Sequence, residues 1–156
     1  MSEASAGRDV RSLSDFAWRR LLDRIVGMRD AEYDWEPAPG VPTIAWRLHH
    51  IGSTLAQARN AQWLGLDRAP DAFDPGSTPA TVDEALSFLD RAYASWTSVL
   101  VAIPDASLME PIGAVGGPYG DQSRLSLVFH VVDEVIHHAA EVALLRDLYR
   151  ARTVMP

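Results

Sequence analysis

Prolines and glycines divide this sequence into four long segments, each with the apolar spacing of an α-helix. The first predicted helix begins near Ser14, a candidate N-cap, and continues to Met28. Pro37, Pro39 and Pro42 exclude a helix from the connection that follows. No segment shows the two-residue apolar alternation of a surface strand. The pattern therefore predicts an all-α fold, a four-helix bundle.

The second predicted helix opens after Thr43, which can cap it, and stops at Gly65. A polar connection at 66–80 follows it. This connection is too long for a tight antiparallel turn and could serve as a crossover. The bundle need not have a simple up-down-up-down topology.

The third and fourth predicted helices also carry start and stop signals. Thr81 followed by Glu84 has the form of a capping box and opens the third helix, which Pro104 closes. The fourth helix starts near Ser123 and continues to about Ala151.

The length of 156 residues fits a single domain spanning 1–156, in which we expect 1–11 to be a flexible N-terminus. The connection at 105–121 contains the run GAVGGPYG, typical of a flexible loop. Because it leads into the last helix, it could form a rim or lid over a site there.

Composition excludes several classes of function. The formal net charge of −7 argues against a nucleic-acid partner, which needs a basic patch. The absence of cysteine excludes disulfides, thiolate metal ligands and a cysteine nucleophile. There is no signal-peptide core and no run of ~20 apolar residues that could span a membrane. We therefore expect a cytoplasmic protein without a membrane partner.

Two polar residues interrupt the apolar stripe of the last predicted helix. The stripe consists of Leu127, Val131, Glu134, His138, Val142 and Leu145. Glu134 and His138 stack on one helix face, where burying them is costly unless they are paired. A divalent metal would pair with both, since carboxylate oxygen and imidazole nitrogen suit zinc or another first-row metal. The alternative is an i, i+4 hydrogen bond on a solvated face.

A metal site needs at least three protein ligands. The second predicted helix carries His49 and His50, and either could be the third ligand, because both flank the apolar stripe of that helix. His130 and His137 are expected at the surface or as hydrogen-bond partners that orient a ligand.

Other interpretations fit less well. The HExxH motif is absent, and Glu134 with His137 makes only one Glu-x-x-His unit where a di-iron bundle needs two. Arg146 and Asp147 are expected to form a solvated pair near a helix end. Core or interface positions are expected for the four helical tryptophans, Trp18, Trp46, Trp63 and Trp96.

Two motifs resemble the DinB-like superfamily. TIAWRLHHIG is similar to its second-helix motif, and DEVIHHAAEVALLRDLY is similar to its last-helix motif. The resemblance implies a four-helix bundle of up-down-down-up topology, commonly dimeric, with a divalent metal held between the second and fourth helices. Many members carry His-x-x-x-His on the last helix. Here Glu134 takes the first of those positions, as in the mycothiol-dependent maleylpyruvate isomerase branch.

Carried onto this sequence, the resemblance implies His50, Glu134 and His138 as metal ligands. Zinc is the expected metal, with nickel, manganese or iron as alternatives, and a low-molecular-weight thiol is the implied co-substrate. His137 and Glu141 are candidates for a supporting catalytic role. We expect a homodimer that acts on a small electrophile as a thiol-dependent S-transferase or isomerase. The alternative is a non-catalytic dimeric bundle that binds a metal or a small ligand.

Overall fold

The computed structural model describes residues 5–152, and their regular secondary structure is helical apart from one isolated bridge between Pro111 and Ser123. The elements are α1 (Ala6–Ile25), α2 (Asp30–Tyr33), α3 (Ile44–Ala56), α4 (Ala58–Trp63), α5 (Val82–Ala102), the 3-10 helices η1 (Asp105–Met109) and η2 (Ala114–Tyr119), and α6 (Arg124–Ala151).

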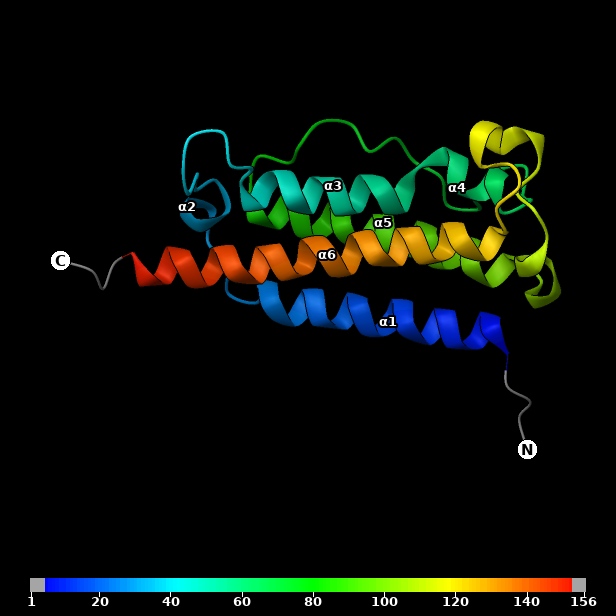
Figure 1. The fold of residues 1–156 in the computed structure, drawn as a ribbon. Coiled ribbons are helices and arrows are strands. Elements are labelled where there is room, and N and C mark those ends of the chain that lie inside the picture. Colours follow the sequence, from blue (N-terminus) through cyan, green and yellow to red (C-terminus); the bar gives the residue numbers. More distant parts are fainter. Residues whose placement is uncertain (1–4, 153–156) are drawn as a thin grey trace.

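The four long helices α1, α3, α5 and α6 form a bundle (Figure 1). In Figure 1, α1 and α6 run in one direction and α3 and α5 in the other, which is the up-down-down-up order. Residues 64–81 return along the bundle before α5 begins, so this connection is the crossover that its length suggested. The prediction of an all-α bundle is confirmed.

The core lies where the long helices meet. Its fully buried side chains include Leu21 of α1, Leu48 of α3, Trp96 of α5 and Val131 of α6. Gly52 allows α3 to approach α5, because a Cβ atom at this position would lie 2.2 Å from the ring of Phe88. Across residues 5–152, no helix has both the length and the apolar character needed to cross a membrane.

The first helix begins earlier than the predicted cap at Ser14. Ser5 is the N-cap, and its side chain accepts a backbone N–H of the first turn. Residues 6–11, predicted to be flexible, are therefore helical, while residues 1–4 lie outside the described part of the chain. Ser14 is instead buried within α1, where its hydroxyl oxygen accepts a hydrogen bond from the Trp96 indole at 3.1 Å.

The second predicted helix is broken at Gln57. Thr43 caps α3 as predicted, but the backbone of Gln57 (φ −57°, ψ 126°) leaves the helical region and separates α3 from α4. The buried side-chain amide of Asn60 donates to the carbonyl oxygen of Thr54 at 2.8 Å. This bond satisfies one of the carbonyls left open where α3 ends.

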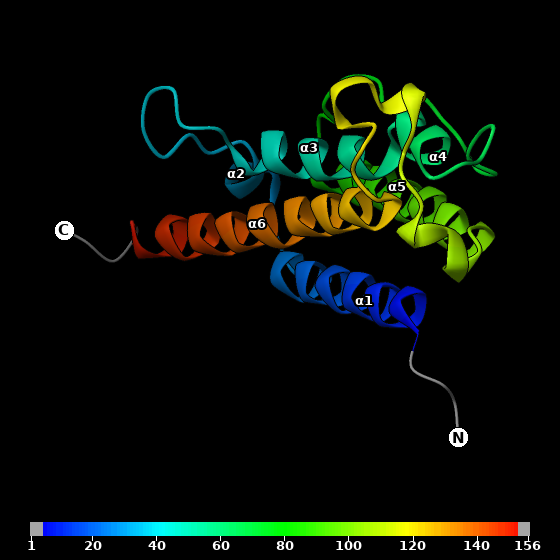
Figure 2. The ribbon, with the colours of Figure 1, turned by 45° about the vertical axis from the view of Figure 1, so that its right-hand side comes forward.

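The predicted caps of the third and fourth helices are correct, since Thr81 caps α5 and Ser123 caps α6. The connection at 105–121, predicted to be a flexible loop, consists of η1, η2 and the turn that the Pro111–Ser123 bridge closes. Figure 2 shows η2, in yellow, standing beside α4.

The prediction of a solvated Arg146–Asp147 pair is wrong. Arg146 is 4% exposed and forms a buried ion pair with Glu32 of α2, which is 3% exposed. Its guanidinium also donates to the backbone carbonyls of Arg24 and Val26, where α1 ends. Arg146 therefore joins α6 to both α1 and α2, a tertiary role that its local sequence does not show.

Candidate metal centre

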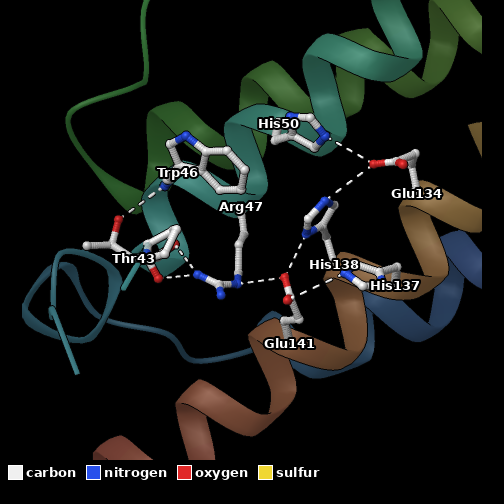
Figure 3. A network of polar contacts seen from close by, with 9 residues as sticks. Thr43, Trp46, Arg47, His50, Glu134, His137, His138 and Glu141 are labelled. Carbon is white, nitrogen blue, oxygen red and sulfur yellow. Dashed lines mark hydrogen bonds and ion pairs between the residues drawn. The ribbon is translucent and has the colours of Figure 1, made fainter. Parts of the chain in front are cut away.

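Three ligand-type side chains converge between α3 and α6. Nε2 of His50 lies 3.1 Å from Oε2 of Glu134, and Nε2 of His138 lies 3.3 Å from the same oxygen. Figure 3 shows both imidazole rings directed toward the Glu134 carboxylate. The structure thus brings together the three residues that the family resemblance implies as ligands.

The spacing of these atoms suits one cation. The donor atoms of His50, Glu134 and His138 all lie within 4.8 Å of one another. In a tetrahedral site with bonds of 2.0–2.1 Å, neighbouring ligand atoms are about 3.3 Å apart. Two imidazole nitrogens and one carboxylate oxygen are a ligand set used for divalent first-row metals. The side chains present therefore fit a divalent metal.

His138 lies between two carboxylates. Its Nδ1 is 2.7 Å from Oε2 of Glu141, while its Nε2 faces Glu134. An ionised carboxylate only accepts hydrogen bonds, so Nδ1 carries the proton that is donated to Glu141. With Nδ1–H donating to Glu141, the other nitrogen of a neutral ring, Nε2, is free to bind a cation. A carboxylate behind a ligating histidine is the usual way to fix its tautomer and ring orientation.

Glu141 is in turn held by Arg47, whose Nε donates to its Oε2 at 2.8 Å. Arg47 is 8% exposed, and its guanidinium also donates to the carbonyl oxygen of Pro42 just before α3. The network therefore extends from the start of α3 through Glu141 to His138 (Figure 3).

Among residues 5–152, one other group of three donors could hold a metal: His137, His138 and Glu141. Here Oε2 of Glu141 already accepts from both Arg47 and His138. The Arg47 charge would also repel a cation bound at this carboxylate. No arginine forms such an ion pair with Glu134 in the described part of the chain. The His50, Glu134 and His138 group is thus the better cation site.

The two carboxylates are kept ionised by their surroundings. Partial burial acts to raise the pKa of Glu134, but the hydrogen bond from His50 and the nearby histidines outweigh it and lower the pKa. For Glu141, burial is likewise outweighed by the hydrogen bonds from His138 and Arg47, and the pKa is lowered. Both side chains are therefore negatively charged under ordinary conditions, as a cation site requires.

The site opens to solvent on the side of His50, whose side chain is 38% exposed, whereas that of His138 is 11% exposed. The indole of Trp46 stacks on the His50 ring at 5.0 Å and is itself 45% exposed. Trp46 is therefore not part of the core, which was one of the two positions expected for it. It lies beside His50, on the exposed side of the three ligand candidates.

The remaining histidines, His49, His130 and His137, do not belong to the group of three converging side chains. His49 lies 3.1 Å from the carbonyl oxygen of Gly76 and packs on Phe88, so it joins α3 to the crossover and α5. His130 and His137 are exposed, and Nε2 of His137 lies 3.5 Å from Oε1 of Glu141. Both exposed positions agree with the sequence expectation.

Arg47 was not identified from the sequence, although its spacing offered a signal. Arg47 precedes His50 by one helical turn, and Glu141 follows His138 by one turn. Because α3 and α6 are antiparallel neighbours, the pairing of His50 with His138 puts Arg47 opposite Glu141.

Comparison with known proteins gives a match to one family. The sequence model of the DinB superfamily matches residues 14–142, which include His50, Glu134 and His138. The fold is similar to the crystal structure of a conserved protein from Enterococcus faecalis, with a TM-score of 0.69 and 17% sequence identity. That alignment covers 94% of this chain and 98% of the other. No curated protein sequence gives a significant match.

Proposed function

This chain belongs to the DinB superfamily, and from that premise we propose that it is a divalent-metal enzyme, either an S-transferase that joins a thiol to a small electrophile or a thiol-dependent isomerase of such an electrophile. The observation that carries the proposal is the convergence of His50, Glu134 and His138 on one point between α3 and α6. We propose zinc as the metal, since two imidazoles and a carboxylate with an open position are typical of catalytic zinc sites.

The chain's own residues prepare the site for this chemistry. His50, Glu134 and His138 would hold the metal, and Glu141 would keep His138 in the Nδ1–H tautomer that leaves Nε2 free to bind. When bound, a divalent cation lowers the pKa of a thiol or water and so supplies a nucleophile near neutral pH. Since the chain contains no cysteine, a reacting thiol would be a separate small molecule.

Supporting roles fall to the side chains around the opening. The exposed face of Trp46 offers a flat apolar surface for the substrate beside His50. His137 is the one exposed imidazole on α6 next to His138, and it contacts Glu141. We propose that it accepts or donates a proton beside the metal.

A panel of thiols and electrophiles tests the proposal. Zinc-loaded protein is mixed with mycothiol, bacillithiol, glutathione or cysteine, each with a set of small electrophiles, and conjugate formation or isomerisation is followed. We expect turnover with at least one pair, loss of it in His50→Ala, and retention of it in His49→Ala, because His49 faces the crossover. Metal binding with no turnover of any pair would favour the alternative, a non-catalytic bundle that binds a metal or small ligand.

We also propose that the protein forms a homodimer through α1 and α6. Leu13 of α1 and Phe129 of α6 line one surface hollow, with Phe16 of α1 one turn further along. These side chains are 40%, 51% and 53% exposed respectively, which is unusual for a cluster of large apolar groups. Light scattering should give the mass of two chains for wild type and of one chain for Phe129→Glu.

A further inference from the structure

We infer that the protein has a second binding site, in the cavity between α4, η2 and the first half of α6. The ligand expected there is a carboxylate attached to a flat, apolar group. The cavity has a volume of about 340 Å³, within the usual range for small-molecule sites. Its walls include Arg59, Trp63, Ile112, Tyr119, Leu127 and His130. It is separate from the three metal-ligand candidates, none of which lines it.

Arg59 supplies the cavity with a positive charge that the protein leaves unpaired. Its Nε donates to the side-chain oxygen of Gln57, which orients the guanidinium. Within residues 5–152, neither of its terminal nitrogens has a protein acceptor, and no carboxylate lies within ion-pair distance. The two terminal nitrogens of a guanidinium match the two oxygens of a carboxylate.

The charge of the lining is the reverse of that of the whole chain. The formal net charge is −7, with 21 acidic side chains against 14 arginines. None of the residues that line this cavity is acidic, whereas Arg59 is cationic and His130 can donate an N–H. A cavity without acidic groups on an acidic protein favours an anion over a cation.

Aromatic rings give the cavity its shape. Trp63 lies under the Arg59 guanidinium at 4.8 Å, and its ring is 5.9 Å from that of Tyr119. Leu127 and Ile112 add aliphatic walls. A flat, apolar body can pack on these groups while its carboxylate reaches Arg59. The expected ligand is therefore a carboxylate on an aromatic or conjugated group.

The broken second helix builds this site. Because the chain leaves the helical path at Gln57, α4 presents Arg59 and Trp63 toward α6 and η2. Gly113, at φ 85°, precedes η2 in a conformation that favours glycine, and η2 ends with Tyr119 in the cavity wall. The GAVGGPYG loop thus provides part of this cavity.

The position of the cavity suggests what it does for the proposed reaction. His130 lies one helical turn before Glu134 on α6, a rise of about 6 Å, and Ser126 of the cavity wall lies about 12 Å before it. A substrate that occupies this cavity would therefore have its nearer end about one helical turn from Glu134. This last step rests on the proposed function, whereas the carboxylate site itself does not.

Benzoate and its neutral analogue benzamide test the site on the full chain. Binding is measured by calorimetry, first with chelator present, so that no metal can take up the carboxylate, and then with zinc. We expect benzoate to bind more tightly than benzamide, and Arg59→Gln to weaken benzoate by roughly 10-fold or more while changing benzamide little. The control Arg91→Gln removes an exposed arginine that stacks on Phe73, away from the cavity, and should change neither.

Two further variants keep the outcomes distinct. Arg59→Lys, which retains the charge but loses the planar pair of donors, should give an intermediate affinity for benzoate. His50→Ala should bind benzoate as wild type does, even where all metal and turnover are lost. Equal binding of benzoate and benzamide, or unchanged benzoate binding in Arg59→Gln, would overturn the inference. So would benzoate binding that requires the metal.

Discussion

Nδ1 of His138 lies 2.7 Å from Oε2 of Glu141, so this imidazole presents its other nitrogen, Nε2, to Glu134. The contact sets both the tautomer and the direction of a candidate ligand. We predict that Glu141→Gln lowers metal affinity by roughly 10- to 100-fold without loss of the fold, because a neutral amide holds the imidazole less firmly.

The matched control for this change is Asp147→Asn, which removes an exposed carboxylate from the same helix. Competition against a chromophoric zinc chelator gives both affinities, and circular dichroism checks the helix content. Equal zinc affinities for Glu141→Gln and Asp147→Asn would show that Glu141 does not support the site.

The ion pair between Arg47 and Glu141 should make stability depend on pH. The pKa of Glu141 is lowered from its ordinary value of 4.5, against the effect of burial, by bonds from His138 and Arg47. A lowered folded-state pKa means that the stabilisation is present above the ordinary value and is lost as the pH falls through the lowered one. Arg47→Met should therefore reduce the free energy of unfolding near pH 7. Below about pH 4.5, this free energy should decrease less steeply with falling pH than it does in wild type.

We expect the loss in Arg47→Met to be about 1–3 kcal/mol at pH 7, less than for a fully buried pair, because the Glu141 side chain is 34% exposed. Urea unfolding of metal-free protein at pH 7 and pH 3.5 measures both effects. If the free energy of unfolding decreases as much between the two pH values in Arg47→Met as in wild type, the assigned pairing of Arg47 with Glu141 is contradicted.

The buried pair between Arg146 and Glu32 should matter more for stability. Both residues are almost fully buried, so Arg146→Met leaves the Glu32 carboxylate unpaired in the core. It also removes the hydrogen bonds that Arg146 donates to two backbone carbonyls at the end of α1. We predict a loss of about 3–5 kcal/mol in the free energy of unfolding. The double variant with Glu32→Gln should lose less than the sum of the single changes. A loss below 1 kcal/mol in Arg146→Met would contradict this role.

Local sequence signals were sufficient for most of the helical framework. Thr43, Thr81 and Ser123 could be identified because an N-cap interacts only with its own first turn. The start of α1 could not, since Gly7 lowers helix propensity and its role is tertiary: a Cβ atom there would lie 2.1 Å from the Asp105 carboxylate. Only the folded chain brings these two residues together.

The candidate site was predictable only in part. The polar interruption of the apolar stripe on the last helix identified Glu134 and His138 from periodicity alone. The choice of His50 over His49 came from the family resemblance, because both flank the stripe of α3. The structure shows His49 beside the crossover and His50 beside α6, a difference set by which neighbour packs on each side of α3.

Metal content of protein prepared without a His-tag tests the central claim most directly. After zinc loading and dialysis, mass spectrometry should give about one zinc per wild-type chain and a similar value for His49→Ala. It should give little zinc for His50→Ala and His138→Ala, because each removes one of three converging donors. Zinc content that stays the same in His50→Ala and His138→Ala as in wild type would contradict the account.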